Sequence, residues 1–366
     1  MLSSFLLAAC LLAVRPALAS PDFLSREDVR AFIALMTKEH GITRSDLERI
    51  LGDVRYTPAA VRLTGPVPSS APSPARSYAR YRAKFLTPDL ISAGSQFWAQ
   101  HAEDLARAET EYGVPSEVIV GIIGVETAFG RNTGTFRAID ALASIAFDGE
   151  RRQDYFRDEL KELLLLARDS KIDPLVIKGS YAGAVGLPQF MPSSYRRYAV
   201  DFDGDGAIDL VGSPADAIGS VASYIKAFGW VMGETPIAPV RLASGSEADF
   251  VSGLERVHDV SDVQSKGVVF SGRDPPAVLC SIFELPTPGQ PSKFVAGFTN
   301  FEVITRYNRS TFYASAVLEL GEAIRKARSP VQAGHEPCER RASAPAAAGI
   351  QSCDAPGTTA TPSSAT

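Results

Sequence analysis

The sequence predicts a mainly α-helical protein of the α+β class with one small β-rich subdomain. Apolar residues recur at helical spacing along residues 87–112, and residues 118–125 are apolar or Gly on every side, which indicates a helix buried all round. From about 236 to 300, Pro and Gly become more frequent and short β-branched runs appear, such as residues 267–270. With 366 residues, of which 45% are hydrophobic, the chain can build a core without staples.

Residues 1–19 are expected to be an export signal rather than part of the fold. An apolar stretch at 5–14 is followed at 17–19 by the small-x-small pattern of a cleavage site, and the stretch is too short to span a membrane. This predicts a soluble periplasmic protein. The alternative is a lipoprotein, because residues 7–10 resemble a lipobox in which Cys10 would carry a membrane lipid anchor.

Composition and apolar pattern divide the rest of the chain into segments. Residues 20–78 should form short helices over 24–60 and then a connector rich in Pro and Ser. Helical patterns in the central segment, 79–235, cover residues 87–112, 116–130, 151–168, 193–199 and 214–228. Pro115 enters the second of these helices and Gly130 ends it. After the β-rich segment 236–300, residues 301–328 return to helix, and the polar tail 329–366 is expected to be disordered.

Charge and cysteine content narrow the function. The formal net charge is -5 and no long basic run is present, so nucleic acid is not an expected partner. Cys280 lies in an apolar run and is expected to be buried and inert. Cys338 and Cys353 could form a disulfide in an oxidising compartment, and the cysteines have no zinc-site spacing.

Glu126 is the sharpest single feature. It follows the apolar helical run 118–125, where a carboxylate loses hydration and its pKa rises. A carboxyl group with a raised pKa can carry a proton at neutral pH and give it to a leaving oxygen, as the cleavage of a glycosidic bond requires. The alternative is a Glu that reaches solvent past the end of its helix. From the helix pattern alone, that alternative is the more common case.

A metal loop is predicted at 201–216. Asp201, Asp203 and Asp205 occupy positions 1, 3 and 5 of a calcium loop, Gly206 is at the turn, and Ala207 offers its carbonyl at position 7. Gly212 stands where a bidentate Glu is expected, and Asp216 can supply the missing carboxylate. Oxygen ligands favour Ca²⁺ over zinc or copper, in a structural role. The alternatives are an Asp-Gly turn without metal, or a calcium sensor, which would need paired loops.

Several ordered stretches then carry a family resemblance. They are GIIGVETAFGRNTG at 121–134, ALASIAFDGERRQDYF at 141–156, SYAGAVGLPQFMPSSY at 180–195, DFDGDGAIDL at 201–210, DAIGSVASYIKAFGW at 216–230 and NFEVITRYNRSTFYA at 300–314. The chain resembles the lysozyme-like lytic transglycosylases, and more narrowly the membrane-bound lytic murein transglycosylase B family, over roughly residues 24–327. The resemblance implies a lysozyme-like helical catalytic domain at 79–235, with the helix at 301–328 completing its cleft.

The resemblance also implies a reaction. Such enzymes act on peptidoglycan glycan strands and cleave the β-1,4 bond between N-acetylmuramic acid and N-acetylglucosamine. The muramoyl 6-hydroxyl attacks C1 and leaves a 1,6-anhydro product. Glu126 would act first as acid and then as base, while the N-acetyl group of the substrate stabilises the cationic centre. No organic cofactor is implied, and a monomer is expected.

The same resemblance points to substrate-binding residues. The polar candidates are Ser180, Gln189 and Asn308, and the cationic candidates for substrate carboxylates are Arg151 and Arg152. The candidates for packing on sugar rings are Tyr81, Phe190, Tyr224, Tyr307 and Tyr313. The alternatives are turns and caps for the polar residues, solvated charges for the arginines, and core packing for the aromatic residues.

Two departures and two rival functions remain open. Residues 187–188 (Leu-Pro) and 128–129 (Ala-Phe) differ from the family pattern, which puts fine substrate positioning in doubt. A hydrolytic muramidase would need a second carboxylate, for which Asp140 and Asp148 are candidates. A non-catalytic peptidoglycan-binding protein would keep the fold without turnover, but it would have no need of Glu126.

Overall fold

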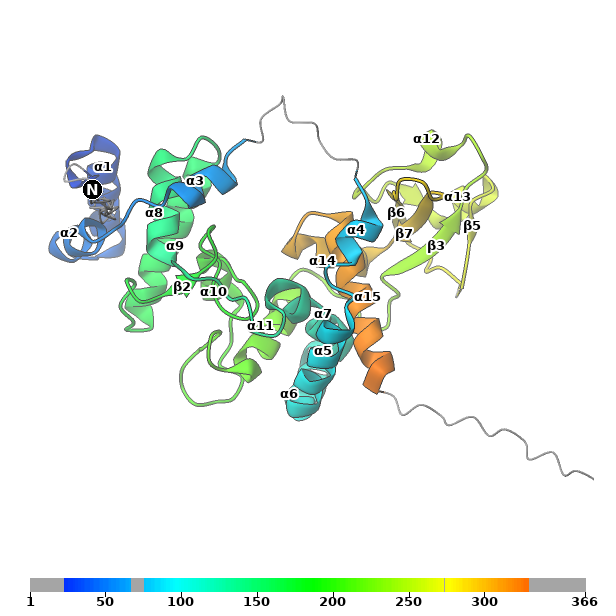
Figure 1. Cartoon of the computed structure of the whole chain (residues 1–366), viewed down its shortest axis with the longest axis horizontal. Coiled ribbons are helices and arrows are strands. Elements are labelled where there is room, and N and C mark those ends of the chain that lie inside the picture. The colour runs from blue at the N-terminus through cyan, green and yellow to red at the C-terminus, as the bar shows by residue number, and fades with distance from the viewer. Residues whose placement is uncertain (1–22, 67–75, 273, 329–366) are drawn as a thin grey trace, which may run out of the picture. The chain divides into compact units, whose positions relative to one another are not determined.

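The computed structural model describes residues 23–66, 76–272 and 274–328 (Figure 1). The predicted signal segment with Cys10, most of the Pro- and Ser-rich connector, and the tail with Cys338 and Cys353 lie outside the described residues. In the described part of the chain, no helix combines the length and apolar character needed to cross a membrane.

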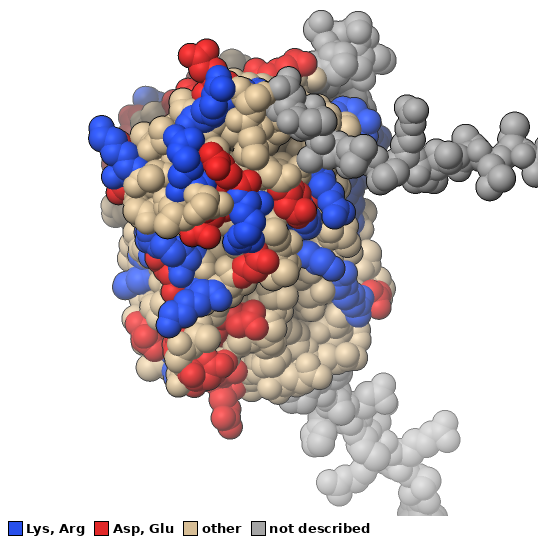
Figure 2. All heavy atoms as spheres, turned by 90° about the vertical axis from the view of Figure 1, so that its left-hand side faces the viewer, with Lys and Arg blue, Asp and Glu red and all other residues tan. Residues whose placement is uncertain are grey.

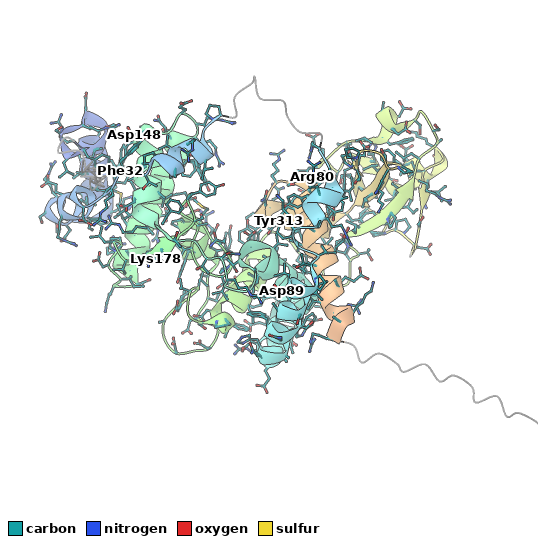
Figure 3. The ribbon with its side chains drawn as sticks, in the orientation of Figure 1. Phe32, Arg80, Asp89, Asp148, Lys178 and Tyr313 are labelled. Carbon is teal, nitrogen blue, oxygen red and sulfur yellow. The ribbon has the colours of Figure 1, made fainter. Side chains whose placement is uncertain are left out.

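The first described segment is helical, as predicted for residues 24–60. Its elements are η1 (Phe23–Ser25), α1 (Glu27–His40), α2 (Arg44–Gly52) and α3 (Pro58–Thr64). Helix α1 buries Val29, Phe32, Ile33 and Met36, which the 3.6-residue period places on one face. Arg26 pairs with Asp148 at 2.7 Å, which ties this segment to the end of α8 (Figure 3).

The central segment supplies most of the helices. They are α4 (Tyr78–Arg82), α5 (Pro88–Gln100), α6 (Ala102–Tyr112), α7 (Ser116–Thr127), α8 (Ala138–Asp148), α9 (Gln153–Asp169), α10 (Pro192–Tyr198) and α11 (Pro214–Ala227). The predicted helical stretch 87–112 is therefore two helices that meet at His101. The end predicted for α7 at Gly130 is wrong, because Ala128 already adopts a left-handed φ of 50° and closes the helix.

Two short strands and a small sheet complete the secondary structure. Strands β1 (Phe136–Arg137) and β2 (Lys178–Gly179) pair antiparallel on either side of α8 and α9 in the sequence. The five-stranded sheet has the order β4-β6-β7-β3-β5. Its elements are β3 (Ile237–Arg241), α12 (Glu247–Phe250), β4 (His258–Asp259), α13 (Val260–Ser265), β5 (Val269–Phe270), β6 (Leu279–Leu285) and β7 (Lys293–Gly297). The predicted small β-rich subdomain is thus confirmed, with strands that lie between Ile237 and Gly297.

The subdomain has its own small core. Ile282 of β6 faces Ala296 of β7 in register, and both side chains are fully buried. Cys280 is buried and unpaired, and burial raises the pKa of its thiol to about 11. The prediction that Cys280 is buried is therefore confirmed, and a raised pKa is in keeping with a thiol of low reactivity.

The last segment is two helices rather than the single helix predicted at 301–328. Helix α14 (Thr299–Tyr307) ends before Asn308, which is extended at φ −147° and ψ 120°. Helix α15 (Thr311–Arg328) then begins anew. Ser310 accepts a hydrogen bond through its hydroxyl from the backbone N–H of Tyr313, and its carbonyl accepts from Ala314. This local capping pattern explains why a second helix starts here.

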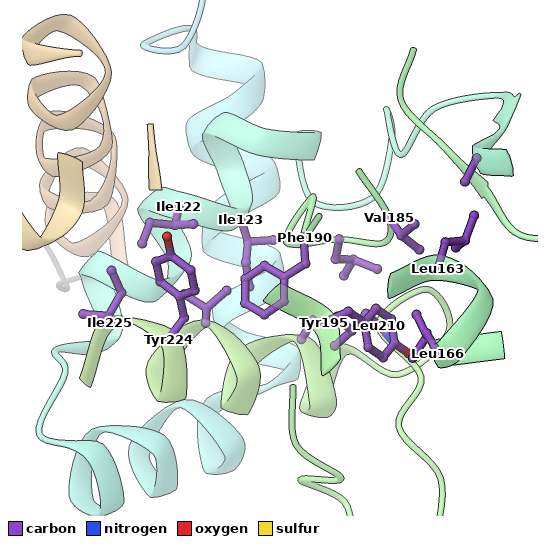
Figure 4. Packing of buried hydrophobic residues seen from close by; sticks show 14 of the residues in the cluster. Ile122, Ile123, Leu163, Leu166, Val185, Phe190, Tyr195, Leu210, Tyr224 and Ile225 are labelled. Carbon is purple, nitrogen blue, oxygen red and sulfur yellow. The ribbon is translucent and has the colours of Figure 1, made fainter. Parts of the chain in front are cut away.

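Helices α7 and α15 pack closely because each carries a Gly at the contact. A Cβ at Gly121 would lie 2.4 Å from the carbonyl oxygen of Val317, and a Cβ at Gly321 would lie 2.1 Å from that of Glu117. Real Cβ atoms do not approach other atoms this closely, so only Gly permits the approach. On another side of α7, Ile122 and Ile123 pack in the main core near Phe190 (Figure 4).

The surface carries charges of both signs. Figure 2 shows Lys and Arg side chains interspersed with Asp and Glu on the face that it presents. Ion pairs elsewhere in the described structure include Arg168–Asp169 and Arg196–Asp169, at 2.7 and 3.1 Å. Exposed pairs of this kind contribute only about 0–1 kcal/mol each to the stability of the fold.

Candidate active site

A hydrogen bond between two distant parts of the chain defines the centre of the site. The hydroxyl of Tyr313 donates to Oε1 of Glu126 at 2.6 Å, across 187 positions of sequence. Glu126 lies in the last turn of α7 and Tyr313 in the first turn of α15, where Figure 3 labels it. The close packing of α7 on α15 therefore brings the donor to the carboxylate.

Burial raises the pKa of Glu126 to about 7, while the hydrogen bond from Tyr313 lowers it in part. The predicted rise in pKa is thus confirmed. The side chain is only partly exposed, which accounts for the loss of hydration. At neutral pH a group with this pKa is present in comparable amounts as acid and as carboxylate, so it can donate a proton in one step and accept one in the next.

Tyrosines form the electrostatic surroundings of this carboxylate. Burial is the main cause of the raised pKa values of Tyr81, Tyr224 and Tyr307, and the charge of Glu126 adds to each of them. The ring of Tyr307 stacks on that of Tyr313 with centroids 6.4 Å apart and 15° between the planes. Four predicted aromatic residues therefore gather around Glu126.

The burial of the aromatic residues corrects part of their predicted role. Phe190 and Tyr313 are each 2% exposed and Tyr224 is 7% exposed, so they belong to the core, where Figure 4 labels Phe190 and Tyr224, and have no free ring face for a sugar. Tyr224 donates through its hydroxyl to the carbonyl of Arg306 at 2.8 Å. Direct packing on sugar is therefore not supported for these three. Tyr81 and Tyr307 keep partial exposure.

Ser180 and Gln189 line one hollow of about 350 Å³ together with Tyr181 and residues 131–136. The Gln189 amide donates to the carbonyls of Thr133 and Gly186, both at 3.0 Å. Its backbone has a left-handed φ of 50°, which is rare outside Gly and is typical of functional sites. The Ser180 hydroxyl accepts from two backbone N–H groups of the 180–184 turn. Both residues thus hold their local turns while they line the hollow.

The remaining polar candidates are exposed. Arg151 and Arg152 precede α9, and Arg152 has a left-handed φ of 56°. The guanidinium of Arg152 lies 4.0 Å from the ring centroid of Tyr155. Asn308 follows Tyr307 directly and is open to solvent. None of these contacts ties the three residues to Glu126 in the described structure.

Residues 187–188 and residues 128–129 depart from the family pattern, and both pairs support the site through their backbones. The carbonyl of Leu187 accepts from the hydroxyl of Thr127 at 2.9 Å, and that of Pro188 accepts from the hydroxyl of Tyr307 at 2.6 Å. Residues 128–129 both have positive φ, at 50° and 60°. The end of α7, which carries Glu126, is therefore followed by a strained turn. The surrounding packing must hold this turn in its conformation.

Neither candidate for a second catalytic carboxylate is free. Asp140 is 7% exposed, pairs with Arg137 at 2.7 Å and accepts from the backbone N–H of Arg55. Asp148 pairs with Arg26 at 2.7 Å. Both carboxylates hold the N-terminal segment against α8, so neither is free to act as a second catalytic base.

The predicted metal loop brings three of its carboxylates together. Oxygens of Asp201, Asp203 and Asp205 lie within 4.8 Å of one another and are exposed. Gly206 has φ 93°, the left-handed turn expected at the sixth position of a calcium loop. The donors are all oxygens, which suits a hard cation such as Ca²⁺. The residues present therefore fit this ion.

The structure corrects the role predicted for Asp216. It is 1% exposed and lies outside the cluster of three carboxylates. Its Oδ1 accepts from the backbone N–H groups of Phe202 and Asp203, and its Oδ2 accepts from that of Asp209 at 2.7 Å. Asp216 therefore holds the loop by its backbone from the first turn of α11, which leaves the fourth carboxylate of a calcium site unassigned.

Three comparisons with known proteins show which proteins this chain is similar to. The family model described as the transglycosylase SLT domain matches residues 25–322. The chain belongs to the transglycosylase SLT domain family. The match covers all the described helices that contribute to the site and most of α15.

Two lytic transglycosylases are similar to this chain over most of its length. Membrane-bound lytic murein transglycosylase B of Escherichia coli strain K12 is 43% identical over 314 residues, or 84% of this chain and 85% of the relative. Soluble lytic transglycosylase SltB1 from Pseudomonas aeruginosa has 44% identity and a TM-score of 0.76, over 82% of this chain and 99% of that one. These homologues are lytic transglycosylases, and the resemblance predicted from the sequence is confirmed.

A third relative has been solved with bound groups. The Escherichia coli lytic transglycosylase Slt35 in complex with bulgecin A has 42% identity and a TM-score of 0.78, over 85% of this chain and 97% of that one. Slt35 in complex with calcium has 42% identity and a TM-score of 0.77 over the same shares. The mainly helical, lysozyme-like architecture with a small β-subdomain is shared with these structures.

Sequence reasoning missed two aromatic residues of the SLT domain site. Tyr181 lines the hollow with Ser180, and Tyr155 lies under Arg152. Both fall inside matched stretches, at 180–195 and 141–156, so position in a motif could have found them. The sequence pattern does not show that Tyr181 lines a hollow with Ser180, or that Tyr155 lies against Arg152.

Proposed function

We propose that this chain is a lytic transglycosylase that cleaves the β-1,4 bond between N-acetylmuramic acid and N-acetylglucosamine in peptidoglycan. Membership of the transglycosylase SLT domain family supports the reaction class. The observation that carries the proposal is the half-buried Glu126, with a pKa of about 7 and a hydrogen bond from Tyr313. Asp140 and Asp148, the two candidates for a second carboxylate, are each engaged by an arginine.

One carboxyl group is sufficient for the two steps. Protonated Glu126 gives its proton to the glycosidic oxygen as the bond from that oxygen to C1 breaks. The N-acetyl oxygen of the substrate stabilises the cationic C1. Glu126, now a carboxylate, then takes the proton of the muramoyl 6-hydroxyl as that oxygen attacks C1. The product is a 1,6-anhydromuramoyl end, and Glu126 is protonated again.

Substrate contacts are proposed for the residues around this centre. Ser180 and Gln189 would hold the acetamido group in their shared hollow, and Asn308 is proposed as a further polar contact. Tyr81 and Tyr307 keep partial exposure and would pack on a sugar face, and the exposed Arg151 and Arg152 would bind substrate carboxylates. Phe190, Tyr224 and Tyr313 act from the core by positioning Glu126 and its neighbours.

Ca²⁺ is proposed as a structural ion rather than a catalytic one. Asp201, Asp203, Asp205 and the carbonyl of Ala207 would hold it, and the complex of Slt35 with calcium supports the choice of ion. The ion would offset the mutual repulsion of three clustered carboxylates and fix the 201–209 loop in front of α11.

Location follows from the N-terminal segment. We propose export to the periplasm as a soluble monomer, with a lipoprotein anchored through Cys10 as the alternative. The name of the relative, a membrane-bound transglycosylase, is compatible with either form of exported protein. The mass of the mature protein decides between them, since lipidation adds acyl chains to a new N-terminal Cys10 whereas the cleaved form begins after residue 19.

The decisive experiment is product analysis with purified sacculi. Mass spectrometry of the released muropeptides should show 1,6-anhydro ends for the native chain and no release for Glu126→Gln, which can no longer donate a proton. Glu117→Gln, on the same helix, is the matched control and should release native products. Products with reducing ends would identify a hydrolytic muramidase instead, and unchanged release by Glu126→Gln would overturn the mechanism.

A further inference from the structure

Glu159 is a buried carboxylate that the function proposed above does not use. Among the described residues, three carboxylates belong to side chains that are less than one tenth exposed: those of Asp140, Glu159 and Asp216, at 7%, 3% and 1%. Asp140 pairs with Arg137, and Asp216 holds the 201–209 loop. Glu159, in the middle of α9, has neither of these roles. Because a buried carboxylate costs free energy unless other groups hydrogen-bond to it, the partners of Glu159 indicate what it does.

On one side, Glu159 holds the start of helix α10. Its Oε2 accepts from the backbone N–H of Ser193 at 2.9 Å, and its Oε1 accepts from the Ser193 hydroxyl at 2.7 Å. Ser193 is the second residue of α10, where a negative charge is favourable, and it follows Gln189 by four positions. Glu159 therefore fixes the point at which the segment 180–189, whose two ends line the hollow, passes into a helix that packs on α9.

On the other side, Glu159 faces Tyr155 and Arg152. Positions 152, 155 and 159 follow the spacing of one face of a helix. The pKa of the Tyr155 hydroxyl is raised to about 12, chiefly by burial and then by the charge of Glu159 and a hydrogen bond with it, whereas Arg152 lowers this pKa by its own charge and hydrogen bond. The guanidinium of Arg152 also lies 4.0 Å from the Tyr155 ring centroid. Tyr155 thus links the carboxylate to the guanidinium.

This link matters because Arg152 is exposed. A long exposed side chain samples many rotamers, and a ligand that binds to it must offset the entropy lost when one rotamer is selected. A chain of contacts runs from Ser193 through Glu159 and Tyr155 to Arg152, and it begins in the buried core. It reduces the number of rotamers that Arg152 samples before a substrate arrives.

We infer that Glu159 is a positioning residue of the substrate site, which holds the guanidinium of Arg152 through Tyr155 and the segment that carries Gln189 through Ser193. The inference rests on the proposed function, in which Arg152 and Gln189 contact the substrate. The simpler alternative is that Glu159 only caps α10. In that case its loss would lower stability and leave the contribution of Arg152 unchanged.

The kinetic test removes the charge of Glu159 and keeps its shape. Glu159→Gln should raise KM for glycan strands about threefold to tenfold, the range of one hydrogen bond, and leave kcat within about twofold. Arg152→Gln should raise KM by a similar factor in the native chain, but by less than about twofold in the Glu159→Gln chain, where the guanidinium is no longer held. Glu162→Gln, on the same helix, is the control. Its carboxylate pairs with Arg196, and the change should leave KM at the native value.

A second variant breaks the same link from its other end, in case Glu159→Gln folds poorly. Tyr155→Phe keeps the ring against the guanidinium and removes the hydroxyl that faces Glu159. It should also make Arg152→Gln less harmful than it is in the native chain. If Arg152→Gln raises KM by the same factor in the native, Glu159→Gln and Tyr155→Phe chains, the inference is wrong, whatever their melting temperatures.

A measurement without substrate separates this inference from the function on which it rests. In a chain labelled with isotope-enriched arginine, the Nε–H resonance of Arg152 is assigned by its absence in Arg152→Gln. It should shift in Glu159→Gln and Tyr155→Phe and stay in place in Glu162→Gln. If the native chain cleaves no glycan, the proposed function fails, while a shifted resonance still supports the positioning role. A resonance that stays in place in both variants would overturn that role.

Discussion

The hydroxyl of Tyr313 lies 2.6 Å from Oε1 of Glu126, and the ring that carries it is 2% exposed. A buried ring has little freedom to turn, so the donor stays aimed at the carboxylate. A donor of this kind favours the ionised form of its acceptor. It therefore holds the pKa of Glu126 near 7, where burial alone would raise it further.

Tyr313→Phe should move the pH profile upward. Without the hydroxyl, the carboxylate form of Glu126 loses a hydrogen bond, and the pKa rises above its present value of about 7. Loss of a charge-assisted hydrogen bond corresponds to about 1–2 pKa units. Activity that requires the protonated form should persist to higher pH by about that amount. The measurement is kcat/KM against pH, and a shift downward would contradict the assignment.

Glu126→Gln should stabilise the fold in a pH-dependent way. The pKa of Glu126 is raised from 4.5 to about 7 in the folded chain, so its relative contribution to stability is greatest below pH 4.5 and falls as pH rises to about 7. Gln does not titrate, so the gain in the free energy of unfolding should grow over this window to at most about 3 kcal/mol. Denaturant unfolding at pH 4, 6 and 8 measures it. A gain that is the same at all three values would contradict a raised pKa.

Gly121→Ala should separate α7 from α15. The added methyl would meet the carbonyl oxygen of Val317 at 2.4 Å, so one helix must move. We expect a loss of about 1–3 kcal/mol in the free energy of unfolding, together with an upward shift of the pH profile of activity because Tyr313 moves away from Glu126. Gly52→Ala in α2 is the control. Its methyl would find only an ordinary contact at 3.4 Å, so the change should leave activity at the native level.

Calcium should raise the melting temperature through the 201–209 loop. At a concentration of a hundred times Kd, binding adds about 2.7 kcal/mol to the stability of the folded state. Asp201→Asn with Asp203→Asn should remove the response to calcium. Asp216→Asn should instead lower the melting temperature with or without calcium, since its carboxylate accepts three backbone hydrogen bonds. Thermal scans with calcium and with a chelator distinguish the two effects.

The residues with a strong local signal could be predicted from the sequence. Glu126 follows an apolar helical run, so its desolvation can be read from the pattern, and the Asp-rich loop has fixed spacing. The helices themselves follow apolar periodicity, and the β-subdomain follows from β-branched runs between Pro and Gly. These features depend on neighbours within a few positions of the chain.

Several contacts that decide the roles of residues could not be predicted from the spacing and periodicity of the sequence. Asp216 has the spacing of a metal ligand, but its burial turns its oxygens to three backbone N–H groups. Tyr313 was expected to pack on a sugar, yet the approach of α15 to α7 makes it a donor to Glu126. Apolar periodicity also did not predict the break between α14 and α15 at residues 308–310, because Ser310 starts a new helix by local hydrogen bonds.

The close contact between α7 and α15, at the Gly residues, also has a consequence for a chain that lacks α15. The acid is supplied by residue 126, but the group that tunes it arrives only with residue 313, near the end of the described fold. A chain that emerges from its N-terminus, or one cut before α15, holds Glu126 without that partner. Loss of this last helix would therefore remove the donor to Glu126 together with the surface against which α7 packs, so one truncation would change both the pKa of the carboxyl group and the stability of the fold.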